Sequence, residues 1–470
     1  MRNRLLHDAL RDFALESAAL LTDDLRDGAE VEFDVIDEGA KRGPALYRYK
    51  PRTEAFLAER WPLLRELPAC RRAADELGAG ASVFLRVNGL RGEQAEPALQ
   101  GMLERLYEDA TSFGFPEERF ERVYAEVEVT LYRDSVRARV VAPLRGVAIE
   151  VDRVDLGGGL WLERGEGVDA PAEAVWGEDG EGEPAVLCAL ERDAPADEGI
   201  PPAEAAERFA RVVTALRLWA PGFVSLGAPG WRRTEGGRWQ ALALGGGPHP
   251  HGDVSFVLRA GEEEGLREFF AALEGAAPTQ AVAWALGRFE MGCERARDDE
   301  ALSDYLLATR ALLDATSDMG EAGLALRVAA LCAEEGARTH VQRRLESAMQ
   351  LEQFVMGGRA PGRGEAEPPG VLVAEVERHL RALLRDVLCG YLDDDLKGVA
   401  DDILVEARAD PHMEIKARDL RVEEPPPPPI AADSGSEPDP DPEPDTSELQ
   451  AVTPSADWGW DDPDDYSAPV

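Results

Sequence analysis

Apolar side chains recur every three or four positions between residues 280 and 408, in four successive stretches. This spacing gathers them on one side of an α-helix, and that side has to be covered by other elements. The third stretch ends at Gly357 and Gly358, a common stop for a helix, and the Gly- and Pro-rich residues after it predict a loop. Four such helices with one longer connection predict a helical bundle. We expect the helices at residues 288–313, 324–332, 341–355 and 371–392.

A second pattern, in which every other residue is apolar, marks the chain before the bundle. Val136, Ala138 and Val140 show it, and it is typical of a strand with one buried face. Residues 121–279 are therefore expected to form a β-rich domain with one or two helices. Its strands are expected at residues 123–131, 136–140, 147–151, 186–190 and 254–258, with a helix at 203–219.

The first 120 residues mix both patterns, with helices expected at 5–25, 54–67 and 96–113 and strands at 31–35 and 82–87. A chain of 470 residues is also too long for one ordinary core. We therefore expect an α+β protein in four parts. These are a mixed α/β N-terminal region at 1–120, the β-rich domain at 121–279, the all-α bundle at 280–408, and a tail at 409–470.

The expected tail has its own composition. Residues 421–470 hold 14 acidic residues, one basic residue and 12 of the 33 prolines. Proline removes backbone donors and like charges repel, so such a segment cannot bury a core and is expected to be disordered. Trp458, Trp460 and Tyr466 stand in this acidic frame. They are either a short element that docks into a basic, apolar groove of an unknown protein partner, or incidental aromatics in a solubilising tail.

Net charge limits the classes of partner. The formal charge of −41 argues against a general nucleic-acid coat or a binder of anionic membranes, since both need a basic surface. A nucleic-acid partner in a local basic pocket stays possible but is not favoured. No run approaches the roughly 18 apolar residues that cross a bilayer, and the first residues resemble an amphipathic helix rather than a signal peptide. Five scattered cysteines without a CxxC pair fit a reducing compartment, so we expect a cytoplasmic protein.

No metal or cofactor is expected. His249 and His251 lie in a Gly-rich loop and could be two metal ligands, but the sequence offers no obvious third. A surface loop is the favoured interpretation. Phosphate-binding and nucleophile-elbow motifs are missing from the sequence. The acidic runs at 393–395 and 401–402 are more typical of solvated helix ends than of a cation site.

The third helical stretch ends in the sequence RRLESAMQLEQFVMGG, residues 343–358. This segment resembles part of the Apea-like HEPN domain family. The resemblance covers roughly residues 120–395 and includes residues 288–313 and 326–331 of the bundle and residues 141–146 and 213–219 before it. The resemblance implies a helical bundle that pairs as a homodimer. It also implies a link to metal-independent ribonucleases of prokaryotic toxin and antiviral systems, because many members of the superfamily have that activity.

Active members of that family end the third helix with Arg-Ser-x-x-Val-His-Gly. Here Leu351 stands at the Arg position and Met356 at the His position. Neither side chain can carry a proton or a positive charge in water, so the resemblance implies a degenerate motif without a catalytic residue. Leu351 and Met356 are then expected to pack in the bundle or at its dimer seam. A basic cluster remains nearby, and within it His340 and Arg344 could imitate the site in reverse order; the cluster is His340, Arg343 and Arg344.

Three functions follow from these observations. The favoured one is a non-catalytic HEPN-type scaffold or ligand-sensing protein, connected by resemblance with prokaryotic defence or toxin–antitoxin systems. A partner-recruiting role of the tail is compatible with it. The alternative is a metal-independent endoribonuclease whose active site is displaced from the usual motif.

Overall fold

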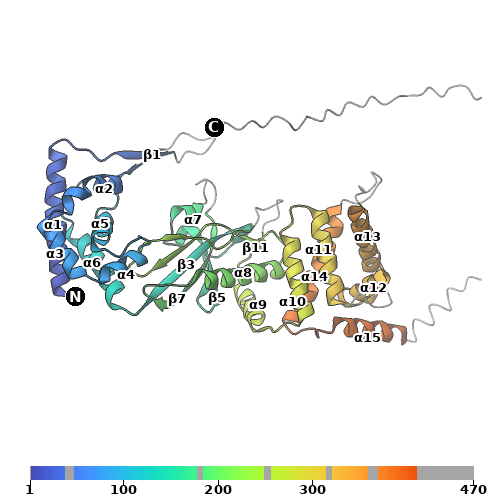
Figure 1. Ribbon diagram of the computed structural model, residues 1–470. Helices are drawn as coiled ribbons and strands as arrows, with labels where there is room; N and C mark the ends of the chain where they lie inside the picture. The colour runs from blue at the N-terminus through green and yellow to red at the C-terminus, as the bar shows by residue number, and fades with distance from the viewer. Residues whose placement is uncertain are drawn as a thin grey trace, which may run out of the picture. The chain divides into compact units, whose positions relative to one another are not determined.

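The computed structural model describes residues 2–37, 47–176, 184–247, 256–313, 320–357 and 369–409. These residues form an α+β protein, and all of them belong to one unit that comprises residues 1–410 (Figure 1). The expected tail beyond residue 409 lies outside the described residues, and so do its three aromatic residues Trp458, Trp460 and Tyr466. His249 and His251 lie outside them as well.

The N-terminal region is built mainly from helices. Leu10 and Phe13 of the first helix are fully buried in a core that all six helices of this region enclose. Asn3 caps the first helix by accepting a hydrogen bond from the backbone of Leu6. The elements are α1 (Arg4–Arg26), the antiparallel hairpin β1 (Phe33–Asp37) and β2 (Tyr47–Pro51), α2 (Thr53–Leu64), α3 (Pro68–Leu77), α4 (Gly80–Val87), α5 (Ala95–Leu106) and α6 (Glu117–Tyr132).

Two segments that the sequence predicted as strands are helical here. Residues 82–87 lie in α4, and residues 123–131 lie in α6. The alternating pattern of the second segment coexists with a helical spacing, because Phe120, Val123 and Val127 are buried on one side of α6. That side packs against the N-terminal core, and this packing selects the helical period over the strand period.

A seven-stranded antiparallel sheet follows the N-terminal region. Its order is β10-β9-β3-β7-β6-β5, with the short β8 paired to β3. A separate parallel pair joins β4 to β11. The strands are β3 (Ser135–Arg145), β4 (Val147–Ile149), β5 (Arg153–Gly157), β6 (Leu160–Arg164), β7 (Val186–Pro195), β8 (Ser225–Leu226), β9 (Gly230–Thr234), β10 (Gln240–Leu242) and β11 (Phe256–Leu258).

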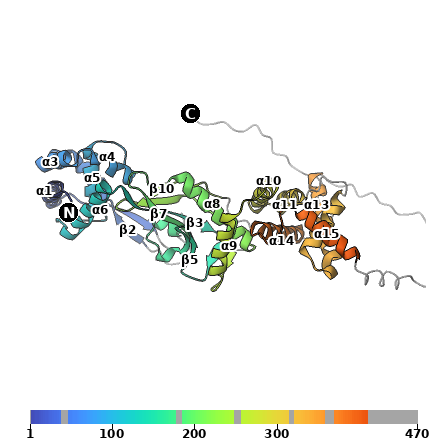
Figure 2. The same cartoon turned by 90° about the horizontal axis from the view of Figure 1, so that it is seen from below.

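Helices cover one face of this sheet. Val140 of β3 and Leu190 of β7 share a buried cluster with Phe209 of α8 (Pro202–Trp219). Figures 1 and 2 show α8 and α9 (Glu263–Gly275) beside the sheet and next to the first helix of the bundle. A short helix, α7 (Ala172–Trp176), contacts β3 and β7. The expected helix at 203–219 is therefore confirmed, and it joins the sheet to the bundle.

The helical bundle has six described helices rather than four. The first expected stretch divides at residues 294–297, because the acidic first turn of a new helix begins at Asp298. A further helix follows the expected fourth one. The helices are α10 (Gln280–Cys293), α11 (Asp298–Leu312), α12 (Gly320–Cys332), α13 (Arg338–Met356), α14 (Pro369–Leu388) and α15 (Leu396–Ala409).

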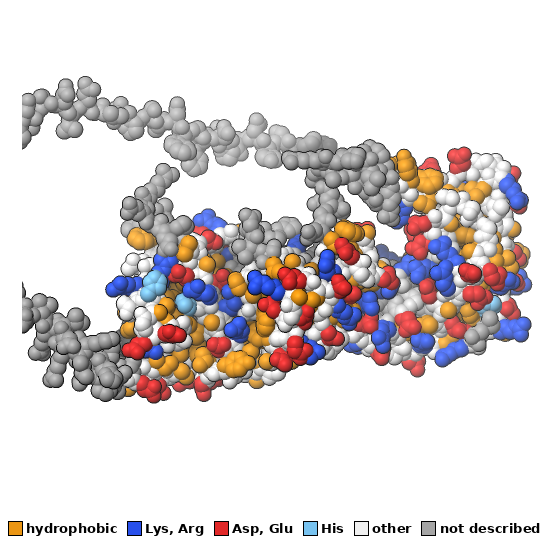
Figure 3. Space-filling view, turned by 180° about the vertical axis from the view of Figure 1, so that it is seen from behind, with side chains coloured by type: hydrophobic (Ala, Val, Ile, Leu, Met, Phe, Trp, Pro, Cys, Tyr) orange, Lys and Arg blue, Asp and Glu red, His pale blue; other side chains and the backbone are white. Residues whose placement is uncertain are grey.

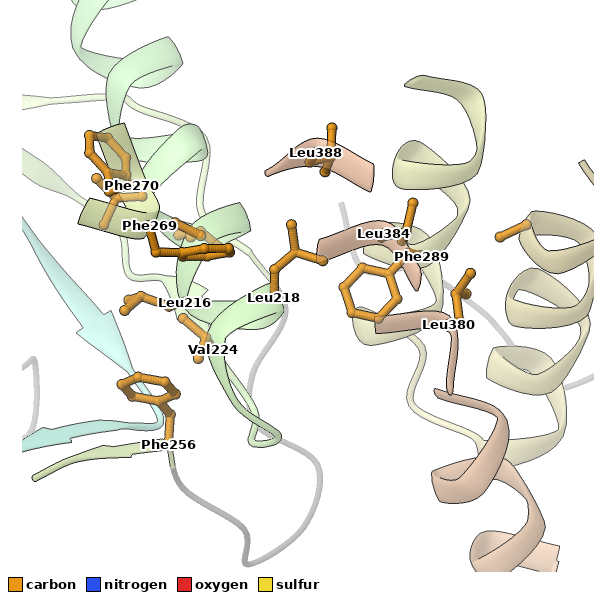
Figure 4. Packing of buried hydrophobic residues seen from close by; sticks show 14 of the residues in the cluster. Leu216, Leu218, Val224, Phe256, Phe269, Phe270, Phe289, Leu380, Leu384 and Leu388 are labelled. Atoms are coloured by element: carbon orange, nitrogen blue, oxygen red, sulfur yellow. The ribbon is translucent and has the colours of Figure 1, made fainter. Parts of the chain in front are cut away.

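The bundle and the sheet share one continuous apolar cluster. Leu216 and Leu218 of α8 belong to the same cluster as Phe289 of α10 and Leu384 of α14 (Figure 4). The N-terminal core is a separate cluster. The junction between α8 and the bundle is therefore a packed interior, and any polar group there needs a partner.

Candidate functional site

The two positions aligned with the ribonuclease motif have different surroundings. Leu351 is 8% exposed and belongs to the cluster that the bundle shares with the sheet, whereas Met356 is 77% exposed. Five residues of an α-helix turn through more than one revolution, so these side chains leave α13 in different directions. Leu351 faces the interior and Met356 faces outward. They do not form one common surface.

An ion pair occupies the turn of α13 beside Leu351. Glu352 is 4% exposed, and both of its carboxylate oxygens accept hydrogen bonds from the guanidinium of Arg310 in α11, at 3.1 and 2.5 Å. Such a two-pronged contact fixes the orientation of both side chains. Arg310 therefore holds α11 against α13 at the residue that follows Leu351.

The basic cluster on α13 does not converge on one point. His340 and Arg343 are exposed. Arg344 is partly buried and donates from Nε to Glu375 Oε2 of α14 at 2.7 Å. On the face shown in Figure 3, basic side chains of the described residues are intermixed with acidic ones. Arg344 thus has a structural contact, while His340 and Arg343 are available to solvent.

The structure also bears on metal sites, membrane-spanning helices and the cysteines. Within the described ranges, no three His, Cys, Asp or Glu side chains gather as a metal site. None of the described helices is long and apolar enough to cross a membrane. All five cysteines are free thiols. Burial raises the pKa of the Cys293 thiol to about 12, which keeps it protonated and poorly nucleophilic near neutral pH.

Buried charged side chains connect α8, α10 and α14. Arg217 of α8 is 4% exposed and donates from Nε to the carbonyl of Val224 at 3.0 Å and from both terminal nitrogens to Glu294 at 3.1 Å. Arg381 of α14 donates from Nε to the carbonyl of Arg217 at 2.8 Å and pairs with Glu377. Burial raises the pKa of Glu377, and the guanidinium of Arg381 opposes that effect. The sheet and the bundle are therefore linked by hydrogen bonds as well as by apolar contact.

Two cavities flank α8 at this junction. The larger, about 470 Å³, lies among α8, α9, α10 and the end of α14. The smaller, about 380 Å³, lies between α8, α10 and the loop Gly245–Gly247. Volumes of a few hundred cubic ångströms suit small organic molecules. Ala210 and Glu290 line both cavities.

The Gly-rich loop has a steric role beside the smaller cavity. A Cβ atom on Gly246 would lie 2.9 Å from Ala228 Cβ, and one on Gly247 would lie 2.8 Å from Ser225 Cβ. The glycines thus allow the loop to approach the backbone around β8 closely.

The sequence analysis did not identify the junction between sheet and bundle, although Arg217 is a sequence signal for it. Arg217 follows Leu216 and precedes Leu218 on a helix whose other core-facing positions are apolar. An arginine at such a position indicates a buried partner. Comparison with protein-family models, with curated proteins and with solved structures finds no match to this chain.

Proposed function

We propose that this chain is a non-catalytic HEPN-type scaffold that senses a ligand at the junction between its sheet and its bundle. The observation that carries the proposal is the separation of the two motif positions. Leu351 lies inside the bundle and Met356 lies outside it, and neither can transfer a proton. Glu352, which follows Leu351 in α13, is paired with Arg310.

Ligand sensing is supported by the position of the cavities. The larger is lined by α8 and α9, which pack on the sheet, and by α10 and α14 of the bundle. The smaller is lined by α8, by the loop Gly245–Gly247 and by Glu290 of α10. A molecule bound there contacts both parts at once, so its binding energy favours one arrangement of the two. That is the physical requirement for a sensor.

A displaced ribonuclease site is the second candidate. Its support is the exposure of His340 and Arg343 on neighbouring turns of α13, where RNA could reach them. Cleavage of RNA needs positive charge beside the scissile phosphate and a group that moves a proton. The partial burial of Arg344 and its contact with Glu375 count against a reversed His340–Arg344 pair.

An RNA cleavage assay without metal separates the two candidates. We expect the purified full chain to leave single-stranded RNA and transfer RNA intact in the presence of a chelator. His340→Ala removes the exposed imidazole without disturbing the bundle, and Thr339→Ala on the same turn is its matched control. Chelator-resistant cleavage that His340→Ala abolishes and Thr339→Ala keeps would overturn the non-catalytic proposal.

Three further parts of the proposal concern partners and setting. We propose a homodimer through the bundle, supported by the exposed Phe354 and Met356 at the end of α13 and testable by sedimentation analysis.

We also propose that Trp458, Trp460 and Tyr466 in the acidic tail recruit a protein partner. That partner should be lost from co-purification when residues 421–470 are deleted. The HEPN resemblance connects the protein with a cytoplasmic prokaryotic defence or toxin–antitoxin system, and the genes beside its own test that connection.

A further inference from the structure

The carboxylates around the two cavities are not equivalent. Three of them have arginine partners within 4 Å: Glu207 pairs with Arg211 at 2.6 Å, Glu274 with Arg208 at 2.7 Å, and Glu294 with Arg217 at 3.1 Å. These pairs balance most of the charge in the cavity walls. The fourth carboxylate, Glu290, lines both cavities.

Glu290 has a weaker partner than the other three. Within the part of the chain that the structure describes, its carboxylate accepts a hydrogen bond from the hydroxyl of Thr214 on α8. That hydroxyl also lies 3.1 Å from the carbonyl of Ala210, and its single proton can serve only one of the two acceptors. A carboxylate can accept about four hydrogen bonds, so Glu290 keeps most of its capacity for a donor from elsewhere.

The wall around Glu290 in the larger cavity is mainly apolar. Leu286 lies one turn before Glu290 on α10 and faces the same cavity. Phe270 and Leu273 of α9 and Leu388 of α14 belong to this wall, and Figure 4 shows Phe270 and Leu388 in the shared cluster. The other charged side chains that line the cavity are Glu207, Arg211 and Glu274, which are all ion-paired. An apolar wall with one uncompensated carboxylate is complementary to a molecule with an apolar body and one positive charge.

We propose that the larger cavity binds a small organic cation, with an apolar body against Phe270, Leu273 and Leu286 and an ammonium group on Glu290. This inference rests on the proposed ligand sensing and specifies its ligand class. The ammonium donates charge-assisted hydrogen bonds to Glu290 Oε1 and Oε2, and these are shorter and stronger than hydrogen bonds between neutral groups. Glu290 belongs to the bundle and Thr214 to α8, so the bound cation adds a charged contact beside the hydroxyl contact that joins these two residues across the junction.

Three probes of one shape and different charge test the ligand class. They are phenethylamine, phenethyl alcohol and hydrocinnamate, titrated against the full chain and followed by saturation-transfer NMR and calorimetry. We expect the amine to bind at least about ten-fold more tightly than the alcohol, because a hydrogen bond to a charged group contributes more than a neutral one. Hydrocinnamate should bind least, since its carboxylate meets Glu290.

Two variants and a control locate the site. Glu290→Gln keeps the shape and should weaken amine binding at least about ten-fold. Leu286→Trp fills the cavity and should block all three probes. Glu268→Gln removes an exposed carboxylate from α9 and should leave amine binding unchanged. Thermal unfolding confirms that each variant is folded.

The outcomes separate this inference from the proposed function. Equal amine binding to the parent and to Glu290→Gln, or no amine binding at all, overturns the cation site. Preference for hydrocinnamate that Leu286→Trp abolishes also overturns it, but leaves ligand sensing intact. RNA cleavage in the assay described above would remove the non-catalytic function without changing the result of the amine titration.

Discussion

The two helical regions of this protein bury their apolar surface in different ways. The N-terminal helices α1–α6 enclose a core of their own, with every member between residues 6 and 127. The bundle helices α10–α15 instead belong to a cluster that extends back through α8 and α9 to the sheet. We therefore expect the N-terminal region to unfold by itself and the sheet and bundle to unfold together.

Buried polar groups differ in the same way. Among described residues, the buried polar side chains of the N-terminal helices are His7, Ser17, Thr53 and Thr130. Those of α8 and the bundle include five charged ones: Arg217, Asp304, Arg327, Glu352 and Arg381. A buried charge is tolerated only with partners in fixed positions. Arg217 and Arg381 make such contacts at the junction between sheet and bundle, and the other three make them between helices of the bundle.

The strongest expected effect comes from cutting the link between α14 and α8. Arg381→Ala removes the donor to the Arg217 carbonyl and leaves the partly buried Glu377 without its cation. We expect a loss of about 3–5 kcal/mol in the free energy of unfolding, measured with urea. Hydrogen exchange should show lost protection in both the sheet and the bundle. Arg385→Ala, 45% exposed and one turn away, should cost no more than about 0.5 kcal/mol. Lost protection in the bundle alone would show that the two parts unfold separately.

A second substitution addresses the N-terminal core. Leu10 is 1% exposed, and Leu10→Ala should destabilise the protein by about 2–5 kcal/mol. Hydrogen exchange should then increase over α1–α6 and stay unchanged in the sheet and bundle. Leu5→Ala on the same helix, at a position 69% exposed, is the matched control. Equal loss of protection in the sheet would contradict the idea of two separate units.

The smallest expected effect is a pH dependence at the junction. Burial raises the pKa of Glu377 above its ordinary value of 4.5, with Arg381 acting in the opposite direction. A carboxyl with a raised pKa binds its proton more tightly in the folded state, so this stabilisation is complete below about pH 4.5 and is lost as pH rises through the folded pKa. Glu377→Gln cannot titrate. Its free energy of unfolding should therefore increase relative to the parent protein as pH rises from acidic to neutral.

Urea unfolding of both proteins across this pH range measures the difference. Glu268→Gln, an exposed carboxylate on α9, is the charge-matched control. Parallel curves for Glu377→Gln and the parent protein would show that Glu377 does not titrate differently on folding.

Much of the fold could be predicted from the sequence where the spacing of apolar residues fitted only one kind of secondary structure. The expected helix at 5–25 is α1 and that at 203–219 is α8, and the third bundle stretch is α13. Prediction failed where two periods overlapped. The alternation of apolar residues at 123–131 fits a strand, and their three- and four-residue spacing fits a helix. Contact with the N-terminal core selected the helix.

The candidate motif shows the same limit for function. The sequence identified Leu351 and Met356 as residues without catalytic chemistry, since that depends only on side-chain type. It could not show that one is buried and the other exposed. It also gave no indication that Glu290 of α10, far before Leu351 in the chain, would line two cavities beside α8.

The sequence by itself therefore determined the α+β class, the helical character of the bundle and the uncharged side chains at positions 351 and 356, because periodicity and residue chemistry are local properties. The tertiary structure decided which helices share a core, which arginines are buried, and where Glu290 meets an apolar wall. These features join residues from α8, α9, α10 and α14, which are far apart in the chain. Their proximity arises only when the sheet and the bundle pack together.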